Sequence, residues 1–197
     1  MGRKSKADVR KKEILEHFYI ILKEEGFENA SIAKIANLME VNPSLLIHYF
    51  KTKEEMVVAF VEFLLGRYED TFKEQMLGAK DPQERFNNIL DVMFSEDWLT
   101  FSDQTVFYAC YYLSSRHPRI KERFQVMYNR FKELLIPHAI SWMETGVIKE
   151  ANPEDVVDYL IVVNEGLTYF DKLMSDPEGF KRRAKFLKSS VLKTLTS

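Results

Sequence analysis

The segment from Ser31 to Lys53 (SIAKIANLMEVNPSLLIHYFKTK) limits the possible folds of this chain more than any other part. It predicts two short helices joined by a tight turn. Ser31 is suited to cap the first helix, because its hydroxyl can accept a hydrogen bond from a backbone N–H of the opening turn. Asn42 caps the second helix, and Pro43 takes its first position, where no N–H is needed. Two helices joined this closely are typical of a helix-turn-helix, whose second helix can enter the major groove of DNA.

The apolar residues of this segment recur at helical spacing, so each helix has a predicted inner face. Ile32, Ile35 and Ala36 form that face in the first helix. Leu46 and Phe50 anchor the second. The residues expected at or near its outer side are Asn42, Ser44, Leu45, His48 and Tyr49. The alternative interpretation is a helical hairpin that only packs against its neighbours.

The motifs of the first third of the chain resemble the N-terminal domain of the tetracycline-repressor (TetR) family of bacterial transcription regulators. The matching residues, at the family's spacing, are Ile14-Leu15, Gly26-Phe27, Ser31, Ile35-Ala36, Val41-Asn42, His48-Tyr49-Phe50 and Lys53-Glu54-Glu55-Met56. The departures are His17-Phe18 for the usual Ala-Ala, Glu40 for the turn glycine, Ser44-Leu45 for Gly-Thr, and Ile47 at a common aromatic position. These departures leave the approach to DNA and the operator sequence open.

The resemblance implies which side chains meet double-stranded DNA. Ser31 and Lys34 would reach phosphate, and Tyr49 and Lys53 would grip the backbone on the other side. The residues expected at the groove floor are Asn42, Pro43, Ser44, Leu45 and His48, which suit modest hydrogen-bond readout and contacts with thymine methyls. The alternatives are a surface role without function for His48 and a packing role for Tyr49.

Composition favours an all-α protein with its own core. Of 197 residues 46% are hydrophobic, only 7 are Gly and 6 Pro, and long stretches have a period of 3.6 residues. No apolar run approaches the ~18 residues of a membrane span. The charged N-terminus lacks the apolar core of a signal peptide, which predicts a cytoplasmic protein. The one cysteine, Cys110, agrees with a reducing compartment.

Positive charge is concentrated at the N-terminal end of the chain. The formal net charge is −2, yet residues 1–53 contain ten Lys/Arg and seven Asp/Glu, a net of +3. The basic residues of the extreme N-terminus are Arg3, Lys4, Lys6, Arg10, Lys11 and Lys12. An arm of this kind suits phosphate contact with release of counterions, and the alternative is a solvated tail.

The helix signals, together with the resemblance to the TetR family, imply a helix-turn-helix DNA-binding domain (1–53) and a helical ligand-binding and dimerisation domain (54–197), with nine helices in all. The expected helices outside the motif are about Ala7–Glu25, ended by Gly26; Lys53–Met76; one from Pro82; one from Ser102 or Asp103 to Arg116; one from Pro118 to Thr145-Gly146, kinked or interrupted at Pro137; Pro153–Met174, capped by Asn152; and one starting at Asp176-Pro177-Glu178.

Two further surfaces are predicted in the second domain. Its large aromatic side chains favour either an ordinary core or an apolar pocket for a small-molecule effector. The candidate pocket residues are Trp98, Phe107, Tyr111, Met127, Phe131 and Trp142. The last two helices carry apolar residues every three or four positions, and similar proteins dimerise through such helices. The candidate interface residues are Tyr159, Leu160, Val163, Leu167, Leu187 and Val191.

An enzyme is disfavoured, because no Glu-x-x-His pair for a helical di-metal site and no phosphate-binding glycine motif is present. No cofactor or metal is expected. A helical adaptor would not need a capped recognition helix with a basic arm. The resemblance to the TetR family therefore implies a homodimeric regulator that binds a palindromic operator, as a repressor released by a ligand, and the aromatic side chains favour an apolar or aromatic one.

Overall fold

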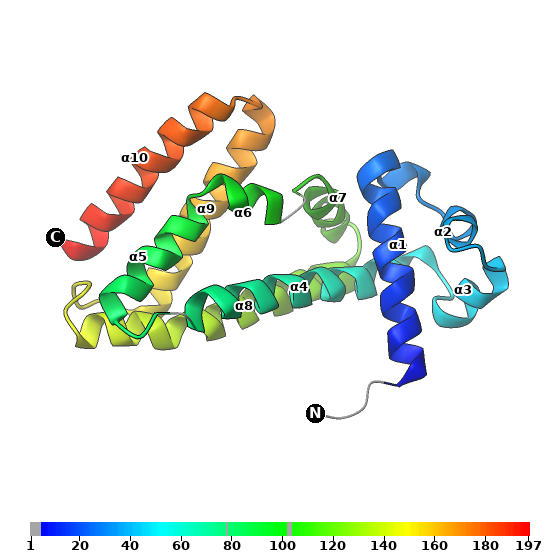
Figure 1. Ribbon diagram of the computed structural model, residues 1–197, viewed down its shortest axis with the longest axis horizontal. Coiled ribbons are helices and arrows are strands. Elements are labelled where there is room, and N and C mark those ends of the chain that lie inside the picture. The colour runs from blue at the N-terminus through cyan, green and yellow to red at the C-terminus, as the bar shows by residue number, and fades with distance from the viewer. Residues whose placement is uncertain (1–4, 78, 102–103) are drawn as a thin grey trace. The chain divides into compact units, whose positions relative to one another are not determined.

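The computed structural model describes residues 5–77, 79–101 and 104–197. Within these ranges every regular element is an α-helix, which confirms the predicted all-α class (Figure 1). The helices are α1 (Lys6–Asn29), α2 (Ile32–Leu38), α3 (Pro43–Tyr49), α4 (Lys53–Leu77), α5 (Pro82–Met93), α6 (Glu96–Phe101), α7 (Gln104–Ser114), α8 (Pro118–Glu144), α9 (Pro153–Met174) and α10 (Pro177–Thr196). The described residues thus contain ten helices rather than nine, because α6 forms a separate short helix. The expected start at Ser102 or Asp103 lies outside the described residues.

The helices group into two compact units. The first holds α1 to α3, α4 as far as residue 67, α7, and α8 as far as residue 127. The second holds the end of α4, α5, α6, the remainder of α8, and the α9–α10 hairpin. These units follow compactness, whereas the boundary expected after residue 53 follows function. That boundary stays a prediction.

The core of the first unit forms around α1. Ser5 and Asp8 form a capping box at its start, with the Ser5 hydroxyl accepting the Asp8 N–H at 3.1 Å. Phe18 is fully buried and meets the Phe60 ring of α4 edge-on, with ring centres 5.1 Å apart. Gly26 breaks the helix at a φ of 79°, as its predicted end requires, but a further turn continues to Asn29.

Cys110 lies on α7 within the same unit, and its side chain is fully buried. Burial in apolar surroundings raises the pKa of its thiol to about 12, because the thiolate would lose its hydration there. Phe107 of the same helix packs edge-on against Phe124, with ring centres 5.4 Å apart. Cys110 therefore acts as a small apolar core residue.

The second unit packs around Trp142 of α8. Its indole is fully buried, and its ring centre lies 4.9 Å from that of Phe86 on α5. The apolar stripe expected on this part of the chain is buried as predicted, at Phe86, Ile89, Leu90, Met93 and Phe94.

Helix α8 continues through Pro137, so the expected interruption is wrong. A proline removes one hydrogen bond to the carbonyl four residues earlier, here that of Glu133. Both Pro137 and Glu133 lie on the exposed side of the helix, where water can hydrate that carbonyl. At the start of α10, the Asp176 side chain makes no capping hydrogen bond, and its carboxylate lies 3.9 Å from the Arg183 guanidinium.

His138 should make the second unit sensitive to acid. Its Nδ1 lies 3.4 Å from an Nη of Arg85, whose guanidinium also donates to the Ala79 carbonyl at 2.8 Å. Burial, and then the charge of Arg85, lower the pKa of His138 below its usual 6.5. The folded state thus disfavours the imidazolium. The contribution of His138 to the free energy of unfolding is therefore full above pH 6.5 and is lost as the pH falls through the lowered pKa. Thermal unfolding of His138→Gln should lose part of the parent's decline between pH 7 and pH 5. The matched change His48→Gln, at an exposed histidine, should retain it.

Candidate functional site

The segment predicted as a helix-turn-helix has the expected local geometry. The Ser31 hydroxyl accepts the Lys34 N–H at 3.2 Å, and the Asn42 side chain accepts the Ser44 N–H at 2.9 Å. Between the helices, Glu40 adopts a φ of 55° and Val41 donates its N–H to Ala36 at 2.9 Å. The turn thus uses the left-handed conformation that favours glycine, although glutamate occupies the position.

Burial separates the two faces of the motif as predicted. Ile35, Ala36 and Leu46 are fully buried, and α2 packs on α3. The predicted readout residues Asn42, Pro43, Ser44 and His48 are exposed, and Leu45 and Tyr49 are half-buried. Helix α3 therefore presents a small polar surface to solvent, with the Tyr49 ring packed edge-on against that of His48, ring centres 5.3 Å apart.

Ile47 is an outer residue that sequence reasoning did not assign to the site. Its side chain is 50% exposed in the middle of α3, three positions after Ser44. An exposed branched apolar side chain on a recognition helix suits contact with a thymine methyl. Helical spacing from Ser44 was the available signal.

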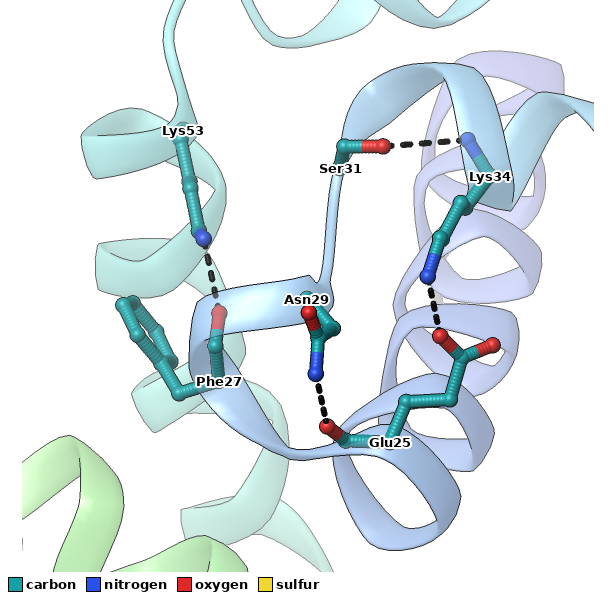
Figure 2. A network of polar contacts seen from close by, with 6 residues as sticks. All are labelled: Glu25, Phe27, Asn29, Ser31, Lys34 and Lys53. Atoms are coloured by element: carbon teal, nitrogen blue, oxygen red, sulfur yellow. Dashed lines mark hydrogen bonds and ion pairs between the residues drawn. The ribbon is translucent and has the colours of Figure 1, made fainter.

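The two lysines predicted to contact phosphate both have partners within the protein (Figure 2). The Lys34 ammonium pairs with the Glu25 carboxylate near the end of α1. The Lys53 ammonium donates to the Phe27 carbonyl at 2.8 Å and lies 4.3 Å from the centre of the Phe27 ring. Burial lowers the pKa of Lys53, an effect that the charge of Glu28 partly offsets.

The basic residues at the start of α1 are largely exposed. Lys6 and Lys11 face solvent, and Arg10 pairs with Glu13 at 2.6 Å. Lys12 lies 3.7 Å from Glu16. Arg3 and Lys4 lie outside the described residues, so their expected place in the arm stays a prediction.

The six candidate pocket residues fall into the two units. Phe107, Tyr111 and Met127 belong to the first, where Tyr111 is 53% exposed and the other two are buried. Tyr111 is therefore mainly a surface residue. Trp98, Phe131 and Trp142 belong to the second unit. There the structure brings Trp98 and Phe131 together, with ring centres 6.4 Å apart, while Trp142 lies in the core.

The second unit also contains a partly buried polar cluster on α9 that sequence reasoning missed. Glu165 accepts the Tyr128 hydroxyl at 2.9 Å, and burial raises the pKa of this carboxyl, while the hydrogen bond opposes the rise. Asn164 and Thr168 beside it are buried, and the Asn164 amide donates to the Met93 carbonyl. The available signal was this pair of polar residues, Asn164-Glu165, inside an apolar helix.

The candidate interface residues divide between the core and the surface of the second unit. Leu160 and Val191 are fully buried and Leu167 is 3% exposed, so these three side chains pack within their own subunit. Tyr159, Val163 and Leu187 are half-buried. The exposed apolar side chains on the outer side of these helices are Val162, Tyr169, Phe170, Leu173, Met174 and Phe186.

A surface groove of about 430 Å³ runs between these two helices. The α9–α10 groove is lined by Val162, Val163, Gly166, Leu167, Phe170, Arg183, Phe186 and Leu187. Arg183 is its one charged residue, and it pairs with Asp171 at 2.9 Å while lying over the Phe170 ring. The groove is thus an apolar surface with a neutralised cation.

The described part of the chain contains neither a candidate metal site nor a candidate membrane span. No three His, Cys, Asp or Glu side chains there are grouped so as to hold a metal ion. No helix among the described residues combines the length and the apolar character of a membrane span.

The capped turn, the exposed recognition helix and the helical second unit define a helix-turn-helix transcription regulator. Residues 19–60 match the family of bacterial regulatory proteins of the tetR type, and residues 81–197 match the tetracycline repressor-like C-terminal domain. The chain belongs to the TetR family of bacterial transcription regulators. The predicted family is confirmed, and the family indicates a DNA-binding regulator rather than an enzyme.

Relatives and solved structures agree with this assignment. The HTH-type transcriptional regulator BetI of Rhizobium meliloti is 28% identical over 123 residues, which cover 62% of this chain and 60% of that protein. BetI of Yersinia pestis is 26% identical, over 62% of each chain. The chain thus spans less than two thirds of the length of the curated relatives it matches. A TetR regulator from Haloarcula marismortui shares the fold, with a TM-score of 0.83, 19% identity, and coverage of 95% of this chain and 98% of that one. A regulator from Saccharomonospora viridis in complex with choline has a TM-score of 0.76 at 15% identity, covering 92% of this chain and 94% of that one.

Proposed function

We propose that this protein is a homodimeric, cytoplasmic repressor that binds a palindromic operator and leaves it when a small ligand binds the second unit. The single observation that carries the dimer is the α9–α10 groove, because Val162 and Phe186 on its rim are each 68% exposed. Exposed apolar side chains clustered in this way mark an interaction surface. A second copy of the same two helices is the partner that would cover them symmetrically.

Dimerisation supplies the geometry that operator binding needs. A two-fold axis at the groove would present two copies of α3, and two recognition helices about 34 Å apart meet successive major grooves of B-DNA. Ser31, Lys34 and Tyr49 are proposed to contact phosphates. The proposed readout residues are Asn42, Pro43, Ser44, Leu45, Ile47 and His48, which the burial pattern leaves at least partly accessible.

The ligand is proposed to bind in the second unit, beside the paired rings of Trp98 and Phe131. Large apolar and aromatic groups there favour an apolar or aromatic effector over a sugar or a phosphate. Glu165 adds one acidic group that could hold a hydrogen-bond donor or a cation. The choline complex of the Saccharomonospora viridis regulator makes quaternary ammonium compounds reasonable members of a test panel.

Selection of bound duplexes from a random DNA pool tests the operator proposal. The selected sequence should have two inverted half-sites. Ser44→Ala or His48→Ala should change the preferred bases, whereas Tyr49→Phe should weaken binding by a similar factor on all related duplexes. Selection of an asymmetric site by a monomer would contradict the proposal.

The ligand proposal has its own test. Apolar, aromatic and quaternary ammonium compounds are titrated into the protein–operator complex while fluorescence anisotropy of the labelled duplex is followed. A ligand that binds the released state about 100-fold better supplies roughly 2.7 kcal/mol per site, enough to loosen the complex. Glu165→Gln should alter the response to cations and leave that to neutral compounds. If the ligand releases the duplex equally well from Trp98→Ala, Phe131→Ala and the parent protein, the ligand binds elsewhere.

A further inference from the structure

The chain between the long part of α1 and the start of α2 forms a short connector, residues 26–30. Gly26 begins it with a φ of 79°, and Ala30 ends it with its side chain 2% exposed. The Asn29 amide donates back to the Glu25 carbonyl at 3.0 Å. The next residue, Ser31, caps α2, so the path of the connector determines where α2 begins.

Two lysines from different helices hold this connector and its border with α1 (Figure 2). Lys34 of α2 pairs with Glu25, but both side chains are more than 40% exposed, so that ion pair contributes little. Lys53, the first residue of α4, is half-buried, and its ammonium meets the carbonyl and the ring of the same residue, Phe27. A hydrogen bond from a partly desolvated charge is stronger than an exposed pair.

The partial burial of Lys53 holds its ammonium against Phe27. The Phe27 ring covers one side at 4.3 Å and the Phe27 carbonyl takes one N–H at 2.8 Å. Burial also lowers the pKa of Lys53, as expected for an ammonium that has lost part of its hydration. In the DNA-free protein the Lys53 ammonium is thus directed at Phe27.

We infer that Lys53 is a positioning residue for DNA binding, which fixes the connector, and with it the start of α2, against the first turn of α4. This role differs from the backbone contact that the resemblance to the family implies for this position. Loss of the ammonium would release the Phe27 carbonyl, loosen residues 26–30, and displace the cap Ser31. The uncharged phosphate-facing groups at the start of α2, the Ser31 hydroxyl and the N–H groups of the first turn, would then lose their alignment, which weakens binding without changing the number of phosphates that cations neutralise.

Counterion release separates the two roles. Each phosphate contact adds about 0.9 to the slope of log K against log salt concentration for duplex DNA, whereas a positioning residue adds nothing. We would measure this slope on a duplex selected from a random pool by the full-length parent protein. The variants are Lys53→Met, Lys53→Arg, and Lys34→Met as the phosphate-contact control.

Lys53→Met should bind about tenfold more weakly at fixed salt, the scale of one hydrogen bond to a charged group, with the parent's slope. Lys53→Arg should restore affinity, because a guanidinium can donate to the carbonyl and stack on the ring. Lys34→Met should lower the slope by about 0.9. In the DNA-free protein, backbone amides of residues 27–34 should exchange hydrogen faster in Lys53→Met than in Lys34→Met.

A slope lowered by about 0.9 in Lys53→Met would overturn the inference, whatever the exchange result. Unchanged affinity, or unchanged exchange over residues 27–34, would overturn it as well. The exchange measurement needs no DNA, so it still decides the role of Lys53 if no operator is recovered and the proposed repressor function fails.

Discussion

Replacing Phe186 by glutamate is expected to split the proposed dimer into folded monomers. Phe186 is 68% exposed on the α9–α10 groove, so the carboxylate meets water in a monomer and does not disturb the core. In a two-fold interface the change occurs twice, and each buried, unpaired carboxylate costs several kcal/mol. Light scattering at micromolar concentration should give half the parent's mass.

The affinity of Phe186→Glu for the operator should fall along with its molecular mass in solution. Two linked half-sites typically bind on the order of 100-fold or more tightly than one. The matched control is Lys185→Glu, which adds negative charge at the neighbouring exposed position outside the groove and should stay dimeric. A Phe186→Glu protein that keeps the parent's mass and affinity would show that another surface joins the subunits. Leu167→Glu is a poor test, because Leu167 is 3% exposed and the change would disrupt the subunit itself.

Trp142→Ala should cause the largest loss of stability of any single change considered. The side chain is fully buried against Phe86, and truncating a buried tryptophan costs about 3–5 kcal/mol. Trp142→Phe should cost much less, because the indole Nε1 is buried without a hydrogen-bond partner and its loss breaks no bond. Chemical denaturation followed by circular dichroism measures both free energies of unfolding.

The comparison also separates the two interpretations of the aromatic residues in this unit. Truncating a core residue lowers the stability of the protein, whereas truncating a residue that only lines a ligand pocket lowers its response to the ligand. If Trp142→Ala unfolds at nearly the parent's denaturant concentration, Trp142 does not support the core and its candidacy as a pocket residue is strengthened. Trp98→Ala, at a half-buried residue, is the comparison variant.

Features that depend on neighbouring residues could be predicted from the sequence. Helix capping is such a feature, because it depends on a side chain and a backbone N–H within three residues of each other, as at Ser31 and Asn42. The helix start at Pro43 is equally local. The inner positions of α2 and α3 follow the helical period for the same reason. The family assignment rests on these local patterns.

Features that depend on distant residues were missed. Lys53 and Phe27 are 26 positions apart, so no local pattern predicts that the ammonium turns toward that carbonyl. The apolar residues of α9 occupy more than one side of the helix, and periodicity alone did not separate Leu160 in the core from Val162 at the surface. Pro137 was expected to kink or interrupt its helix, but α8 continues through it. The effect of a proline inside a helix depends on whether water can reach the freed carbonyl, which the local sequence does not determine.

The buried thiol of Cys110 makes the protein convenient for spectroscopy. A thiol that titrates near 12 is almost wholly protonated at neutral pH, and burial also keeps alkylating dyes away from it. A cysteine introduced at exposed Asn37 on α2 would then be the single reactive thiol of each protomer. One labelled variant, with Cys110 left in place, would report the separation of the two DNA-binding heads by spin or energy-transfer spectroscopy as each effector is added.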